Sequence, residues 1–134
     1  MTVNRLVLAA ALAYGLPGLA LTFGPDAALA WAGASAAPID LWLAQLLGAA
    51  LLGLAFLNWV QRHTLVGGIY GRPLLLANLM FVTIAFFASA RVWLDLGGRL
   101  IAVTTVVLGL FVLAFGGSLF RTPAAVTPAS TPKA

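Results

Sequence analysis

The sequence predicts an all-α fold, namely a polytopic membrane protein whose four transmembrane helices form a bundle. Of its 134 residues, 63% are hydrophobic and 7% are charged, whereas soluble domains are roughly 45–50% apolar and about 25% charged. A soluble domain of this length has too little interior to bury so much apolar surface. Four apolar stretches also approach the roughly 20 residues that a helix needs to cross a bilayer. These observations favour four spans with very little chain left in water.

The first predicted span covers residues 6–23 and contains Pro17. Pro17 has no N–H to donate to the carbonyl of Ala13, so we expect it to kink the helix or to leave that carbonyl free. A cleaved signal peptide is the alternative, because Arg5 precedes the apolar core and small-residue cleavage sites follow it. The core is long for a signal peptide, and we expect the segment to be retained as a span.

The other three predicted spans cover residues 39–60, 74–94 and 100–120. After the first span, Pro25 and Asp26 suit a new first helical turn, which predicts a short helix at residues 27–31 lying in the membrane interface. Residues 122–134 are rich in Pro, Thr, Ala and Ser, and this composition predicts a disordered cytoplasmic tail. Residues 1–121 then form the transmembrane domain.

The distribution of basic residues predicts the orientation of the spans. On one side of the predicted spans lie five of the seven Lys and Arg residues: Arg5, Arg62, Arg72, Arg121 and Lys133. The other side carries Arg91 and Arg99, together with all three acids. The positive-inside rule therefore predicts that both termini are cytoplasmic.

The chain lacks two residue types that often occur in catalytic sites. It contains no Cys and no Glu, which excludes disulfides, thiolate metal sites and thiol nucleophiles. The single histidine, His63, stands beside Arg62 at a predicted boundary and is expected to be a solvated loop residue rather than a pigment ligand. Asp40 begins the second span, where a carboxylate is a favourable helix cap. We expect no enzyme activity and no cofactor, and the scattered basic residues indicate no nucleic-acid partner.

Four polar side chains inside the spans are candidates for intramembrane contacts: Tyr14, Gln45, Asn58 and Asn78. Asn58 and Asn78 lie near the inner ends of consecutive spans, which places them to bond each other across the hairpin, or Asn78 to bond the second loop. Amides between membrane helices usually stabilise packing by roughly 0.6–2 kcal/mol each. The alternative is a polar contact to a bound lipid, quinone or pigment.

Small residues on the second span predict close helix packing. Ala44, Gly48 and Ala55 share one helical face, and Ala49 and Gly53 form a second pair on an adjoining face. Small residues at such spacing let two helix backbones approach each other closely. We expect packing within the chain rather than a dedicated dimer seam.

The second loop is a candidate contact for a lipid or a partner. Gly67, Gly68 and Tyr70 lie in it, between Arg62 and Arg72. Glycines let backbone N–H groups point at one anion, and arginines at the cytoplasmic surface attract anionic lipid. The loop therefore either clasps a phospholipid headgroup or docks on a partner, or it is a tight turn between the second and third spans.

Two stretches, residues 46–59 (LLGAALLGLAFLNW) and 67–74 (GGIYGRPL), resemble a group of small bacterial four-helix membrane proteins of the DoxX-like kind. The resemblance covers roughly residues 23–90. It implies a four-helix membrane fold in the bacterial inner membrane. No activity is established for that group, so the resemblance implies no catalytic or cofactor-binding residue.

Two functions fit these features, and both involve contact with membrane lipids. The first is a non-catalytic structural or accessory subunit that packs against a larger membrane complex or against a second copy of itself. The alternative is a small carrier or binder of a lipid, a quinone or another apolar molecule. Amides bonded to each other in a filled core favour the first function. A cavity open to lipid and lined by those amides favours the second.

Overall fold

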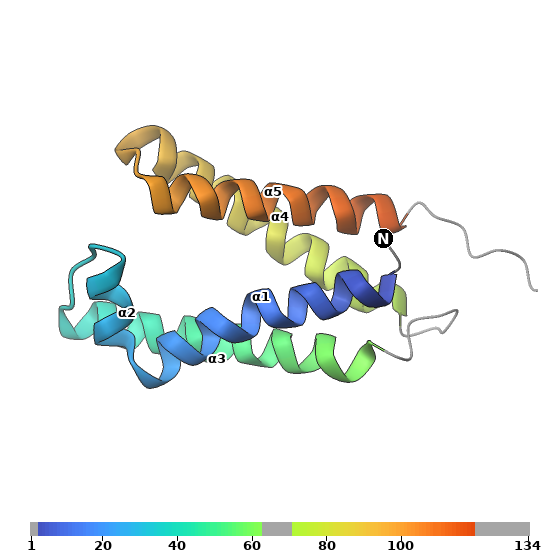
Figure 1. The fold of residues 1–134 in the computed structure, drawn as a ribbon, viewed down its shortest axis with the longest axis horizontal. Coiled ribbons are helices and arrows are strands. Elements are labelled where there is room, and N and C mark those ends of the chain that lie inside the picture. Colours follow the sequence, from blue (N-terminus) through green and yellow to red (C-terminus); the bar gives the residue numbers. More distant parts are fainter. Residues whose placement is uncertain (1–2, 63–70, 120–134) are drawn as a thin grey trace, which may run out of the picture.

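The computed structural model describes residues 3–62 and 71–119, and these residues form five helices (Figure 1). The helices are α1 (Val3–Phe23), α2 (Pro25–Trp31), α3 (Pro38–Gln61), α4 (Gly71–Leu96) and α5 (Arg99–Leu119). All except α2 are long and apolar enough to cross a membrane. The four predicted spans are thereby confirmed as helices, and the chain has the architecture of a multi-pass membrane protein. The predicted tail at 122–134 lies outside the described residues.

The helices α1, α3 and α4 are longer than the apolar runs that predicted them. The third predicted span, 74–94, corresponds to the 26-residue helix α4, which is about 39 Å long at 1.5 Å per residue and exceeds the roughly 30 Å hydrocarbon core. Arg72 lies in the first turn of α4, where headgroups and water solvate a charge. Hydropathy marks only the part of a helix that lies in hydrocarbon, and this explains the difference.

Proline and glycine shape the ends of the helices rather than their middles. The helix α1 runs through Pro17 as one element, and Pro17 itself is exposed. The predicted short helix at 27–31 is confirmed as α2, with Pro25 in its first turn. Gly33 ends α2 in a left-handed conformation, with φ of 72°. Its N–H donates to the carbonyl of Ala30, and the next N–H donates to the carbonyl of Leu29, which is the Schellman pattern that satisfies the last helical carbonyls.

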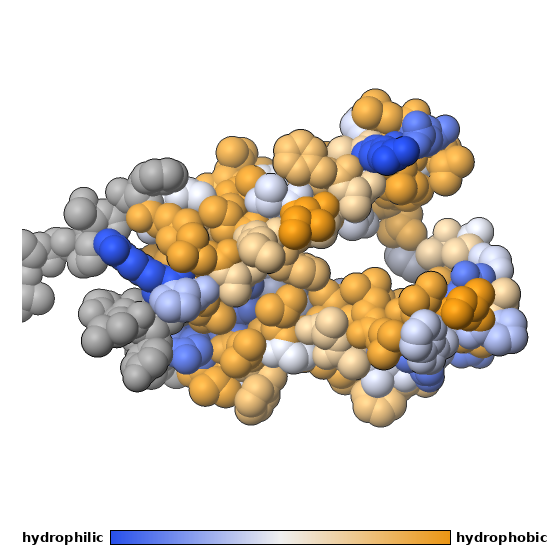
Figure 2. All heavy atoms as spheres, turned by 180° about the vertical axis from the view of Figure 1, so that it is seen from behind, coloured by the Kyte–Doolittle hydropathy of each residue, from blue (hydrophilic) through white to orange (hydrophobic). Residues whose placement is uncertain are grey.

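The four long helices are arranged as two antiparallel pairs, α1 with α3 and α4 with α5 (Figure 1). The pairs meet near the beginning of α1 and diverge toward the end that carries α2 and the Gly97–Gly98 turn. Seen from behind, open space separates the two halves at that diverging end (Figure 2). Close backbone approaches between the pairs run from α1 to α5 and from α3 to α4, and they are few. Packing as a four-helix bundle stays a prediction.

The buried core is small. Its main cluster takes side chains from every long helix, namely Leu6, Ala10 and Tyr14 of α1, Leu51 and Ala55 of α3, Leu75 and Val82 of α4, and Phe115 of α5. Most other large apolar side chains are exposed, as the orange surface in Figure 2 shows. Leu94, for example, is 81% exposed. Water would make such a surface costly, whereas lipid tails solvate it.

Candidate functional site

The clearest polar contact inside the spans is a reciprocal pair of amides. The Nδ2 of Asn58 donates to Oδ1 of Asn78 at 2.9 Å, and the Nδ2 of Asn78 donates to Oδ1 of Asn58 at 3.0 Å. Each amide also donates to a carbonyl four residues back in its own helix, that of Leu54 at 2.8 Å or Leu74 at 2.9 Å. Both side chains are completely buried. The predicted contact across the hairpin is therefore confirmed, and both N–H groups of each amide are used within the chain.

The other two predicted polar residues do not join this pair. Tyr14 is 3% exposed and packs edge-on against Phe81, with ring centroids 5.4 Å apart, and beside Phe111. Its hydroxyl has no hydrogen-bond partner among the described residues. Gln45 is exposed on α3. It stands 13 positions before Asn58 in the sequence, which is about 20 Å along a helix, so it lies at a different depth. The four residues do not line one cavity.

In the described part of the second-loop region, Arg62 contacts Trp59. The Arg62 guanidinium lies over the Trp59 ring, 3.9 Å from its centroid, and an Arg62 N–H donates to the Trp59 carbonyl at 2.6 Å. Arg72 is exposed. Gly67, Gly68 and Tyr70, like His63, lie outside the described residues. Contact of this loop with a headgroup or a partner stays a prediction.

The small-residue face of α3 packs within the chain, as predicted, and the helix that it contacts is α1. Ala44, Gly48 and Ala55 are buried, and Gly48 faces Thr22 and Gly18 so closely that an added Cβ would lie 2.8 Å from the Thr22 nitrogen. Gly18 and Gly48 carry no Cβ, and this absence permits the two backbones to approach so closely. The second small pair differs, because Ala49 and Gly53 are exposed and, in the part of the chain that the structure describes, nothing lies within 4 Å of a Cβ built on Gly53.

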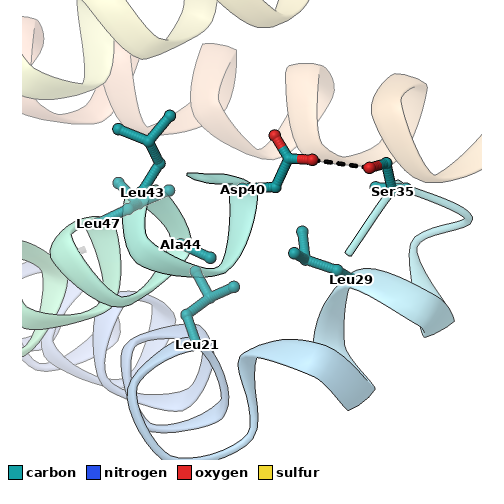
Figure 3. A pocket seen from close by; sticks show the side chains of 8 residues that line it. Leu21, Leu29, Ser35, Asp40, Leu43, Ala44 and Leu47 are labelled. Atoms are coloured by element: carbon teal, nitrogen blue, oxygen red, sulfur yellow. Dashed lines mark hydrogen bonds between the residues drawn. The ribbon is translucent and has the colours of Figure 1, made fainter. Parts of the chain in front are cut away.

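Sequence reasoning missed an open pocket between α1, α2 and α3, with a volume of about 350 Å³ (Figure 3). It is lined by Leu21, Leu29, Ala34, Ser35, Asp40, Leu43, Ala44 and Leu47. The Ser35 hydroxyl donates to Oδ2 of Asp40 at 2.7 Å, and the Ala37 N–H donates to the Ser35 oxygen at 3.3 Å. The pocket exists because the short link after α2 brings Leu29 beside the first turns of α3. In the sequence, the one feature that relates to the pocket is the short separation between Ser35 and Asp40.

The predicted capping role of Asp40 needs a correction. The residue before the first turn of α3 is Ala37, and no side-chain hydrogen bond caps this helix end. Asp40 is the third residue of the helix, and its carboxylate reaches back to Ser35 rather than to a backbone N–H. The negative charge in the first turn still interacts favourably with the helix dipole.

No family model, curated protein or solved structure matches the chain. Within the described residues, no three His, Asp or Glu side chains gather as a metal site would require. The candidate sites are therefore defined by the chain's own geometry: the amide pair, the exposed small-residue face of α3 and the pocket beside α2.

Proposed function

We propose that this chain is a non-catalytic integral membrane protein that acts as a structural or accessory subunit, in contact with a larger membrane complex or with a second copy of itself. The observation that carries the proposal is the closed amide pair. Asn58 and Asn78 satisfy each other and their own helices, so the strongest polar groups of the spans stabilise the fold instead of facing a substrate. Buried amides used in this way are characteristic of helix packing in membranes.

Exposed small residues support a contact with another helix. Ala49 and Gly53 lie on the open side of α3, and no atom of the described residues lies within 4 Å of a Cβ built on Gly116 or Gly117 of α5. Surfaces of this kind let a second helix approach closely in a bilayer, where van der Waals packing drives association. The partner of the proposed subunit would bind there.

The proposed location is the bacterial inner membrane, with both termini in the cytoplasm. Arg5, Arg62 and Arg72 belong to the helix ends at which the two pairs converge (Figure 1). The opposite end carries Asp26, Asp40 and the C-terminal part of α4. This asymmetry supports the orientation through the positive-inside rule.

The experiment is purification from native membrane in mild detergent, followed by mass identification of everything that is retained. Stoichiometric co-migration of another membrane protein, or a defined homo-oligomer, is the expected result. Gly53→Leu is expected to weaken that association, whereas Ala77→Leu on the exposed surface of α4 serves as the matched control. A chain that migrates alone as a monomer would overturn the subunit proposal.

The second candidate function is a carrier or binder of a lipid, a quinone or another apolar molecule. The pocket beside α2 favours it, because its walls are mostly Leu and Ala and its volume lies in the range of about 300–1,000 Å³ typical of small-molecule sites. Retention of one tightly held apolar molecule in the same purification would support this function.

A further inference from the structure

We propose that the pocket beside α2 binds a phospholipid with a primary ammonium headgroup, and that Asp40 recognises the ammonium. This inference rests on the second candidate function and names its ligand class. It does not depend on whether the chain also has a protein partner. Four features of the pocket support it: the walls, the one polar end, the surrounding charges and the depth in the bilayer.

The walls of the pocket suit an alkyl chain. Leu21 comes from α1, Leu29 from α2, and Leu43 and Leu47 from α3, and all four side chains border the same space (Figure 3). Leu43 and Leu47 are about half exposed, so a bound alkyl chain would cover apolar surface that nothing else in the described residues covers. The pocket is open rather than enclosed, and a lipid can enter it from the side.

The polar end of the pocket offers acceptors for N–H groups. Asp40 is half-buried, and one of its oxygens accepts the Ser35 hydroxyl at 2.7 Å. The other oxygen points away from Ser35 (Figure 3) and has no hydrogen-bond partner among the described residues. An ionised carboxylate has about four lone-pair sites, and most of those on Asp40 are open to a donor. Ammonium groups carry only donors.

The charges around the pocket select a cation over an anion. Asp40 is the only charged residue among those that line it. The basic residues predicted for this side, Arg91 and Arg99, belong to α4 and α5, across the space that separates the two helix pairs. A partly desolvated carboxylate without a cation is attracted to a positive group. A phosphate has no basic side chain to bind among the pocket residues, so the lipid phosphate would face water.

The depth of the pocket matches the order of groups along a lipid. Asp40 lies in the first turn of a helix long enough to span the membrane, so it stands near headgroup level. The exposed Trp31 and Trp42 flank it in the chain and are of the type that anchors at this level. Leu43 and Leu47 follow Asp40 by roughly 5 and 10 Å along α3, in the direction of the hydrocarbon. A lipid whose headgroup binds Asp40 would therefore have its acyl chain alongside Leu43 and Leu47.

The test is native mass spectrometry of the full chain ejected from nanodiscs of equal parts phosphatidylethanolamine and phosphatidylglycerol. We expect the chain to retain phosphatidylethanolamine selectively and Asp40→Asn to reduce that retention roughly tenfold, the usual effect of losing one charge-assisted hydrogen bond. Asp26→Asn, which removes an exposed acid of α2 outside the pocket, is the matched control and should retain the lipid. Asp40→Glu keeps the carboxylate and should preserve most of the retention.

Three results would overturn the inference. The first is equal retention by Asp40→Asn and the unaltered chain, and the second is an equal loss in Asp26→Asn. The third is equal retention of phosphatidylcholine in a second set of nanodiscs, where it replaces phosphatidylethanolamine, because its trimethylammonium group has no N–H to donate. Circular dichroism of each variant establishes that its helices are intact, and the phosphatidylcholine comparison, which uses the unaltered chain, keeps the test decisive if Asp40→Asn misfolds. Partner co-migration is measured separately, so failure here leaves the subunit proposal standing.

Discussion

Asn58 and Asn78 face each other across the α3–α4 hairpin and exchange two hydrogen bonds, of 2.9 and 3.0 Å. They lie where the two helix pairs converge, and contacts between α3 and α4 are otherwise few. The amide pair is thus the main polar link between one half of the molecule and the other. In a bilayer, where hydrophobicity does not drive helices together, such a link adds roughly 0.6–2 kcal/mol to the van der Waals packing between them.

Replacing one amide of this pair should destabilise the chain more than replacing both. Asn78→Leu leaves the buried Asn58 amide without its partner, and we expect a loss of about 1–2 kcal/mol in the free energy of unfolding. The double variant Asn58→Leu, Asn78→Leu should recover part of that loss, because no orphan amide remains. Unfolding in mixed micelles, arranged as a double-mutant cycle, measures the coupling. Additive effects of the two single changes would contradict this account.

Gly48 should tolerate no larger residue. An added Cβ would lie 2.6 Å from the hydroxyl oxygen of Thr22 and 2.8 Å from its backbone nitrogen. The backbone nitrogen cannot move aside. We expect Gly48→Ala to force α1 and α3 apart and to cost roughly 1–3 kcal/mol of stability. Gly53→Ala on the same helix is the control, since the space around Gly53 is open, and its higher helix propensity should make it neutral or stabilising. Thermal unfolding in detergent compares the two.

Tyr14 should contribute through its ring and not through its hydroxyl. The hydroxyl is buried without a partner among the described residues, and removing an unsatisfied polar group is neutral or favourable. We therefore expect Tyr14→Phe to leave stability unchanged or raised, whereas Tyr14→Ala should cost about 3–5 kcal/mol by leaving a cavity beside Phe81 and Phe111. The same unfolding assay gives both values. A clear loss in Tyr14→Phe would show that the hydroxyl has a partner, such as a bound ligand, and would favour the binder function.

The sequence was sufficient to predict the parts of the fold that depend on local rules. Long apolar runs located the four spanning helices, and Pro25 together with Asp26 located α2. The two asparagines near facing ends of consecutive spans predicted their contact, since a hairpin brings such positions together. The small residues Ala44 and Gly48 predicted a close approach, although the sequence did not show that α1 is the helix they contact.

The arrangement in two pairs and the pocket were not predictable in this way. In a membrane helix both the packed face and the lipid-facing face are apolar, so no hydrophobic stripe shows which side of α4 or α5 contacts a neighbour. The pocket depends on how α2 folds back over α3, which is a property of the Gly33 turn and the link that follows it. The position of Gln45, in contrast, was predictable from the sequence. It stands 13 positions before Asn58 on the same helix, and this separation excludes a site shared by the two residues.

The pairing of neighbouring helices has a consequence for synthesis of the chain. Each pair is complete in itself, α1 with α3 and then α4 with α5, so the first can assemble in the membrane while the second is still being translated. The Asn58 amide, however, has to wait for a residue 20 positions later, an interval of about 1–4 s at ordinary elongation rates. During that interval the Asn58 amide of a nascent chain can donate to the Leu54 carbonyl of its own helix but lacks its partner Asn78. When α4 inserts, Asn78 pairs with Asn58. The later half of the protein therefore supplies the hydrogen-bond partner that the earlier half lacks.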